Sequence, residues 1–272
     1  MHDPLGDEMK ALERASAGAA LPSALPIYAR IDGRGFSRFT RGMQRPFDPR
    51  MTAAMRATAA HLVQTTHAKA AYVQSDEISL LWNVGPDGEH FFGGKPQKMT
   101  SVLAGIATAA FTQALLADNQ GLSNWIDLLP HFDARVASMP SRDHATRMFA
   151  WRGQDARRNG INQLAQSVFS HRQLQGKSTR DVREMLAEKG VYPHQYPAAS
   201  LNGTLLQRTT VQRPLSEEER ARIPQKHRPG PNETFERSII RAFDEVHPGL
   251  ITNLEDVLFE GAVEQIPQQV SA

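Results

Sequence analysis

Residues 71–82 read AYVQSDEISLLW, and the acidic pair in their middle, Asp76 and Glu77, separates two strand-like apolar pieces. Residues 27–36 read IYARIDGRGF, so that Asp32 ends another strand-like run just before a glycine. Carboxylates at the ends of neighbouring strands can converge on one point, and Mg²⁺ is bound in this way together with water and substrate phosphates. Two such ions, roughly 3.5–4 Å apart, form the clamp used for nucleotidyl transfer. The two clusters therefore predict a metal site.

Two turns are the alternative interpretation. An acidic residue before Gly is commonly a turn residue, and an acidic pair between two strands is commonly a solvated hairpin tip. Two features favour the metal site. Arg30, Arg34 and Arg38 place cations beside Asp32, as a bound triphosphate would need. The acidic pair is flanked by strand-like sequence, where unpaired acids are costly.

The composition is that of an ordinary globular protein. The chain has 272 residues, 40% hydrophobic and 22% charged, enough for one large domain or a domain with an appendage. The absence of cysteine excludes disulfides, thiolate metal sites and a Cys nucleophile. The N-terminus lacks the basic start and apolar run of a signal peptide, and no stretch approaches 18 apolar residues. We therefore expect no membrane association and a cytoplasmic location.

The order of expected elements is typical of an α+β fold. Apolar periodicity and turn residues predict strand, helix, strand pair, helix, strand and further helices, with a possible helix break at Gly160. This order is close to the βαββαβ pattern of a ferredoxin-like antiparallel sheet with helices on one face, an α/β sandwich. The expected strands span 27–31, 71–73, 78–84, 132–139 and 203–210, and the expected helices span 51–67, 98–116, 142–169 and 178–190.

Four motifs in this order resemble one known family. They are RIDGRGF at 30–36, QSDE at 74–77, FDARV at 132–136, and Trp151-Arg152 followed by Asp155 and Asn159. Together they resemble the tRNA(His) guanylyltransferase family, in particular its bacterial and archaeal relatives of the guanylyltransferase-like branch. Those enzymes add nucleotides to the 5′ end of tRNA in the 3′-to-5′ direction, and their fold resembles the palm of ordinary polymerases. The resemblance covers about two thirds of the chain, from residue 27 to residue 210.

The resemblance and the composition together divide the chain into three parts. The expected parts are a loose leader over 1–25, a catalytic palm-like domain over 26–210 with a helical region over 141–190, and a C-terminal extension over 211–272 packed on the body. Within the extension, the proline-rich and basic residues 216–231 predict an extended segment lying over the body. A helix is expected to follow at 233–245.

The resemblance implies a metal-binding and a nucleotide-binding role for the matched residues. Asp32 and Asp76 would bind two Mg²⁺ ions together with the backbone carbonyl of Gly33, and Glu77 would stand beside them as a third catalytic carboxylate. The nucleotide would be wrapped by a loop whose backbone N–H groups face phosphate oxygens. That loop consists of Asp32, Gly33, Arg34, Gly35, Phe36 and Ser37.

Ser75 and Arg45 would contact the same nucleotide. Arg45 stands where the family is expected to have lysine, which keeps the charge but replaces a point charge with a planar fork.

Further basic and polar residues are candidates for contacts with the triphosphate or the tRNA. They are Arg30, Arg135, Arg152, Arg157, Arg158 and Asn159. Arg135 could equally be the partner of Asp133, and Asn159 could instead make a hydrogen bond between helices. Trp151 is interpreted as a core residue. Five arginines predict part of a tRNA surface, with a solvated helix face as the alternative, and they are Arg142, Arg147, Arg157, Arg158 and Arg172.

The implied chemistry is attack of the 3′-OH of a nucleotide on an activated tRNA 5′ end. Activation would come from adenylylation with ATP or from an existing 5′-triphosphate, and GTP or another NTP would be added. Residues 156–160 read ARRNG where the branch closer to the eukaryotic enzymes carries a His-Ile-Asn-Asn type of sequence. This departure favours templated repair of truncated tRNA over G addition to tRNA(His).

Two other functions remain open. A palm-fold nucleotidyl cyclase uses a similar pair of acids, and a non-catalytic tRNA-binding module would retain the fold alone. The resemblance also suggests a homodimer or homotetramer.

Overall fold

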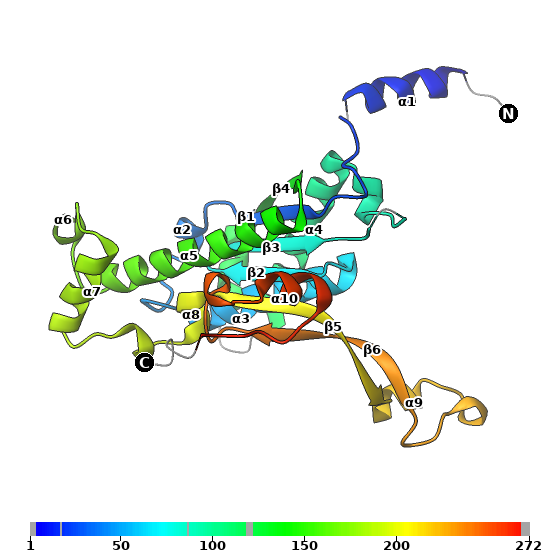
Figure 1. Cartoon of the computed structure of the whole chain (residues 1–272). Helices are drawn as coiled ribbons and strands as arrows, with labels where there is room; N and C mark the ends of the chain where they lie inside the picture. The colour runs from blue at the N-terminus through cyan, green and yellow to red at the C-terminus, as the bar shows by residue number, and fades with distance from the viewer. Residues whose placement is uncertain (1–3, 17, 86, 118–121, 268–272) are drawn as a thin grey trace.

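A six-stranded antiparallel sheet organises the protein (Figure 1). The computed structural model describes residues 4–16, 18–85, 87–117 and 122–267. The strand order is β4-β1-β3-β2-β5-β6, so the first four strands have the order of a ferredoxin-like unit. The strands are β1 (Ile27–Gly33), β2 (Ala70–Gln74), β3 (Glu77–Trp82), β4 (Phe132–Ser138), β5 (Thr204–Pro214) and β6 (Thr234–Phe243).

Helices cover both faces of this sheet. The helices α3 (Pro49–Thr66) and α4 (Pro96–Ala117) pack on one face, where they share a core with Ile27, Ala29 and Ile31. On the other face, α5 (Arg142–Gln166) and α10 (Leu254–Glu260) share a core with Tyr28. The predicted α+β, palm-like fold is confirmed, and α3 and α4 lie together on one face as expected. The expectation that the helices lie on one face only is wrong, because α5 and α10 cover the opposite face.

The remaining helical segments are short, apart from two of 13 and ten residues. These two are α1 (Pro4–Ser16) and α7 (Thr179–Glu188). The short α-helices are α2 (Phe36–Phe39), α6 (His171–Leu174), α8 (Ala198–Asn202) and α9 (Glu217–Ala221). The 3₁₀ turns are η1 (Phe91–Gly94), η2 (Leu122–Leu128), η3 (Pro193–Gln195), η4 (Gln225–His227) and η5 (Pro248–Leu250).

Local sequence explains where the main helices begin and end. The Asp48 carboxylate accepts the N–H of Arg50 at the start of α3, which also has Pro49 in its first turn. The expected helix over 178–190 forms as α7, which begins with a capping box of Ser178 and Asp181. The predicted break at Gly160 is wrong, because α5 is continuous. A Cβ at that position would lie 3.1 Å from Leu201 Cα, so the glycine allows α8 to approach α5.

The helix α4 corrects the expectation about apolar length. It has 22 residues, of which an 18-residue stretch has a mean hydropathy of 1.5, and it is therefore long and apolar enough to cross a membrane by length and composition alone. Its buried residues, however, belong to the core under the sheet, and this packing accounts for the apolar composition. They are Met99, Leu103, Ala107, Phe111 and Leu115.

The C-terminal part of the chain extends the sheet, which corrects the expected helix over 233–245. Residues 234–243 form β6, which pairs with β5 from Leu205↔Phe243 to Pro214↔Thr234. Of these β5 positions, Leu205, Leu206 and Gln207 also pair with β2, and beyond them β5 and β6 continue as a two-stranded ribbon. The segment expected to lie over the body instead forms α9 and η4 at the far end of this ribbon, which projects from the molecule (Figure 1).

The expected loose leader contains a helix. Over the described part of residues 1–25, α1 spans 13 residues and has apolar residues at Leu5, Met9 and Leu12, one helical face. All three are exposed. Residues 1–3 and 17 of the expected leader lie outside the described residues.

Candidate functional site

The two acidic clusters meet at one end of the sheet. Asp32 lies opposite Glu77 of β3 and opposite Asp133 of β4 in the strand register. The N–H of Gly33 donates to the carbonyl of Asp76 at 3.0 Å, which joins the end of β1 to the turn between β2 and β3. Ser75 in that turn has a left-handed backbone with φ of 52°. The structure therefore brings Asp32, Asp76 and Glu77 together, as strands ending side by side would require.

The electrostatics of these carboxyls differ from those of a solvated hairpin tip. Burial raises the pKa of Asp76, and the negative charge of Asp32 raises it further, against the lowering effect of its own backbone and of Ser75. Burial also raises the pKa of Glu77, although Arg152 opposes this effect. Like charges held in a partly buried site favour a bound cation.

Arg152 is engaged with carboxylates of the protein. Its Nε donates to Glu77 Oε1 at 2.7 Å, and its Nη2 donates to the other oxygen of the same carboxylate. A further nitrogen lies 3.3 Å from Asp155. The side chains of Arg152 and Glu77 are only 11% and 15% exposed. The Arg152 side chain is therefore held by a bidentate ion pair with Glu77, and its contact with triphosphate or tRNA stays a prediction.

The oxygen atoms available at this site fit magnesium better than they fit a metal whose ligands all come from the protein. Across residues 4–16, 18–85, 87–117 and 122–267, no group of three or more His, Cys, Asp or Glu side chains is arranged to hold a metal ion. With Glu77 paired to Arg152, the remaining donors are Asp32, Asp76 and the carbonyl of Gly33. Mg²⁺ is commonly bound by one or two carboxylates while water and phosphate complete its coordination. These residues fit that pattern.

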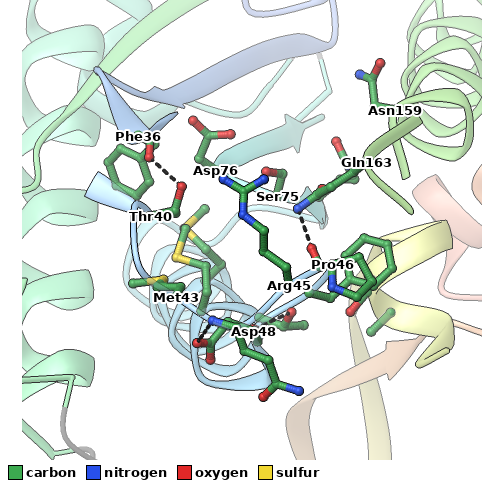
Figure 2. Close-up of a pocket in the computed structure, with 18 of the residues that line it drawn as sticks. Phe36, Thr40, Met43, Arg45, Pro46, Asp48, Ser75, Asp76, Asn159 and Gln163 are labelled. Atoms are coloured by element: carbon green, nitrogen blue, oxygen red, sulfur yellow. Dashed lines mark hydrogen bonds between the residues drawn. The ribbon is translucent and has the colours of Figure 1, made fainter. Parts of the chain in front are cut away.

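A cavity of about 550 Å³ opens beside the acidic turn (Figure 2). It is lined by residues from 36–56 after β1, from the turn at 73–76, from the end of α5 and the residue after it at 159–167, and from 199–204. Ser75 and Asp76 form part of its wall, and the Arg45 side chain points into it toward their turn. The volume is of the size that small-molecule sites have. The acidic turn thus links the carboxylates to a space that can hold a ligand.

Several residues of this cavity were not predicted. Gln163 of α5 donates to the carbonyl of Pro46 at 2.8 Å and so ties the loop to the helix. Asp48 receives a bidentate contact from Arg50, whose hydrogen bonding lowers the pKa of Asp48 to about 2 and keeps it ionised. The sequence could have identified Asp48, because an aspartate directly before a proline is typical of the start of a helix. No pattern in the sequence indicated the role of Gln163.

The loop after β1 is held by two of its own N–H groups. Gly33 donates to Asp76, and Arg34 donates to the carbonyl of His131 at 2.9 Å. These groups are used within the protein, which narrows the predicted phosphate-binding part of the loop to Gly35, Phe36 and Ser37. Gly35 has a φ of 71°, a conformation that favours glycine.

We predict that Gly33→Ala destabilises the protein by about 1–3 kcal/mol, the usual cost of overpacking a core. The added Cβ would lie 2.4 Å from the ring of Phe36, which is buried against Phe111 and Phe132. Thermal unfolding measures the effect. Gly105→Ala on α4 is the control, since its Cβ would meet nothing within 4 Å. Equal melting temperatures for Gly33→Ala and the wild type would contradict the close packing.

Most of the predicted basic contacts have partners within the chain. Arg142 pairs with Glu255 and Glu260 and stacks on Phe259, while Arg157 donates to Asn202. These partners favour a structural role for both arginines.

Three other pairs are more exposed. They are Arg135 with Asp133 at 3.9 Å, Arg147 with Asp143, and Arg158 with Asp155. Arg30 lies 3.8 Å from both Asp32 and Glu77. Asn159 lines the cavity and contacts Asp155 of its own helix, and Arg172 is exposed.

The interpretation of Trp151 as a core residue is wrong. Its side chain is 49% exposed on α5, next to the buried ion pair of Arg152 with Glu77. The guanidinium carbon of Arg152 lies 4.8 Å from the centre of the indole ring. Helix periodicity alone did not reveal which face of α5 meets the sheet.

Known proteins share this fold and these motifs. Residues 6–140 match the family model described as tRNAHis guanylyltransferase (Thg1). A solved structure described as a bacterial tRNA(His) guanylyltransferase (Thg1)-like protein in complex with ATP is 32% identical, with a TM-score of 0.67, over 75% of this chain and 87% of that one. A structure of the same description in complex with GTP is 27% identical, with a TM-score of 0.68, over 90% and 93%. A tRNA(His) guanylyltransferase of Debaryomyces hansenii is 25% identical over 235 residues, 79% of this chain and 86% of that protein.

Proposed function

The chain belongs to the tRNA(His) guanylyltransferase family, and we propose that it adds nucleotides to the 5′ end of tRNA by two-metal nucleotidyl transfer. Family membership makes the protein a nucleotidyltransferase of tRNA processing that works in the 3′-to-5′ direction. The observation that supports the mechanism is the meeting of Asp32 with Asp76, which lines a cavity of nucleotide size.

The carboxylates and the loop have separate tasks in this proposal. Asp32, Asp76 and the carbonyl of Gly33 would hold two Mg²⁺ ions. When bound, these ions lower the pKa of the attacking 3′-OH and neutralise the triphosphate and leaving group. Glu77 holds Arg152 and shapes the acidic end of the sheet. The N–H groups of Gly35, Phe36 and Ser37 would face phosphate oxygens. Catalysis then comes from positioning and charge, without a protein nucleophile.

The cavity beside the turn is proposed to hold a nucleoside triphosphate. The two bacterial relatives were solved with ATP and with GTP, which supports binding of these nucleotides here. Arg45 points into the cavity and supplies a positive charge, while Ser75 supplies a hydroxyl next to Asp76. GTP or another NTP would be added, and ATP would activate a monophosphorylated 5′ end.

We predict that Arg45→Ala raises the KM for the nucleotide by roughly 10- to 100-fold, as expected for losing a charged hydrogen bond to phosphate. Steady-state kinetics with varied GTP test this expectation. Arg45→Lys is the matched variant and is expected to lose less, because it keeps the charge but not the planar fork. A KM unchanged in Arg45→Ala would remove this residue from the nucleotide site.

Repair of 5′-truncated tRNA is the role we propose within the family. The sequence ARRNG at 156–160 supports this role. Within this stretch, Arg157 donates a hydrogen bond to Asn202, and Asn159 donates one to Asp155. The test is a Mg²⁺-dependent assay with labelled GTP on intact tRNA(His) and on tRNAs that lack their first nucleotide. Both monophosphorylated and triphosphorylated forms are used.

The label identifies the reaction. Incorporation only into truncated tRNAs, following the opposite base, is the expected result. Label in intact tRNA(His) would indicate guanylylation instead. A cyclic nucleotide product would indicate the cyclase, and tRNA binding without turnover would indicate a binding module.

A homodimer or homotetramer is also proposed, which light scattering of the purified chain measures directly. The cytoplasmic location stays a prediction.

A further inference from the structure

Trp151 is an exposed indole beside the acidic site, and nothing in the proposed chemistry uses it. Of the three tryptophans, Trp82 is 2% exposed and Trp125 packs against the core, whereas Trp151 is 49% exposed. Large aromatic side chains contribute most to the free energy of binding when they are buried. A half-exposed indole near a substrate site is therefore a candidate for contact with a bound partner.

The surroundings of Trp151 hold the ring in place from one side. The Arg152 guanidinium lies over one face of the indole and is itself fixed by Glu77 and Asp155. Arg152 is nearly buried, so this support is rigid. The exposed half of the side chain is thus offered to solvent in a fixed orientation. A planar partner could stack there without ordering a flexible side chain first.

The indole of Trp151 is linked to the acidic site and has exposed arginines on its own helix face. Trp151 contacts Arg152, and Arg152 pairs with Glu77, the residue that follows Asp76 in the chain. Arg147 and Arg158 share its helix face, at i−4 and i+7, and both are exposed. Basic side chains beside an exposed aromatic ring are the pattern by which proteins bind unpaired nucleotides.

We propose that Trp151 stacks on an unpaired base of the RNA substrate, next to the 5′ end that is extended. This inference rests on the proposed function and adds an RNA-binding residue to it. A free nucleotide is the weaker candidate, because the cavity beside the turn, whose lining does not include Trp151, already offers a nucleotide site. Every base has a face that can stack, so the contact positions the RNA without reading its sequence.

Fluorescence tests the contact directly. An acceptor-stem hairpin with a short unpaired 3′ strand is titrated into the full-length protein without Mg²⁺ or nucleotide, and the same stem with a blunt end serves as the comparison. We expect the unpaired strand to quench tryptophan emission in the wild type and not in Trp151→Phe. Quenching by GTP alone, or equal quenching by the blunt stem, would overturn the inference.

Kinetics separate stacking from a structural role. In Trp151→Leu we expect the KM for the RNA to rise about 10-fold, equivalent to about 1.4 kcal/mol, with the KM for GTP unchanged. Trp151→Phe should restore most of the RNA affinity, because a phenyl ring still stacks. Tyr192→Ala, at an exposed aromatic residue beyond α7, is the control and should match the wild type.

The outcomes distinguish this inference from the function on which it rests. Wild-type kinetics in Trp151→Leu, with nucleotide addition intact, would overturn the stacking contact alone. Quenching that needs both Trp151 and the unpaired strand, in a protein that adds no nucleotide to any tRNA, would support the contact while contradicting the proposed function.

Discussion

Asp76→Asn should reduce nucleotide transfer by at least about 10³-fold, which corresponds to about 4 kcal/mol of transition-state stabilisation. The change keeps the shape of the side chain and removes the charge that would hold Mg²⁺. The fold should survive, because the turn is held by the backbone carbonyl of Asp76, which accepts the Gly33 N–H and remains in the variant.

The stability of this variant gives a second readout with a defined sign. Burial and the charge of Asp32 raise the pKa of Asp76 above its ordinary value of 3.8. A carboxyl whose pKa is raised on folding costs the wild type stability as pH rises from that value through the folded pKa. Asparagine pays no such cost. Without Mg²⁺, the advantage of Asp76→Asn in free energy of unfolding should therefore grow with pH over this range.

Magnesium should reverse the ranking. An ion that binds only the folded state stabilises it, so Mg²⁺ should raise the melting temperature of the wild type and leave that of Asp76→Asn nearly unchanged. Asp133→Asn is the matched control, since its carboxylate lies opposite Asp32 in the register but is exposed and paired with Arg135. Full activity in Asp76→Asn, or equal Mg²⁺ stabilisation of both proteins, would rule out the proposed metal role of Asp76.

The parts of the fold that follow from local sequence were predicted, and the parts set by distant contacts were not. The strands that lead to Asp32 and to Asp76 and the helices α3 and α7 depend on residues a few positions apart. We expected a helix where β6 forms, because charged residues among its apolar ones obscure the two-residue period of a strand. The burial of TFERSIIRAF at 234–243 alternates only once it pairs with β5.

The same division applies to the candidate site. Asp32, Asp76 and Glu77 could be placed together because neighbouring strands end side by side. The ion pair of Glu77 with Arg152 joins residues 75 positions apart, and it depends on how α5 lies over the sheet. The exposure of Trp151 and the hydrogen bond from Gln163 to Pro46 depend on that same packing. No spacing within the sequence carries this information.

Arg152→Ala should lower the free energy of unfolding by about 3–5 kcal/mol, the range found when one partner of a buried ion pair is removed. Both side chains are largely buried, so solvent does not screen the loss. Arg158→Ala is the control, because its pair with Asp155 is more exposed and should contribute about 1 kcal/mol or less. Denaturant unfolding of both variants measures the difference.

The pH dependence identifies the cause of this loss. Burial already raises the pKa of Glu77 above 4.5, and Arg152 is the largest influence that lowers it. In Arg152→Ala the folded pKa should rise further, so that Glu77 is protonated over a wider range. The variant then keeps most of its stability near pH 4.5 and loses it as pH rises through the folded value. Adding Glu77→Gln should recover part of the loss near neutral pH, since no unpaired charge remains buried. A cost for Arg152→Ala that is independent of pH, or no recovery in the double variant, would mean that Arg152 stabilises the protein by packing alone.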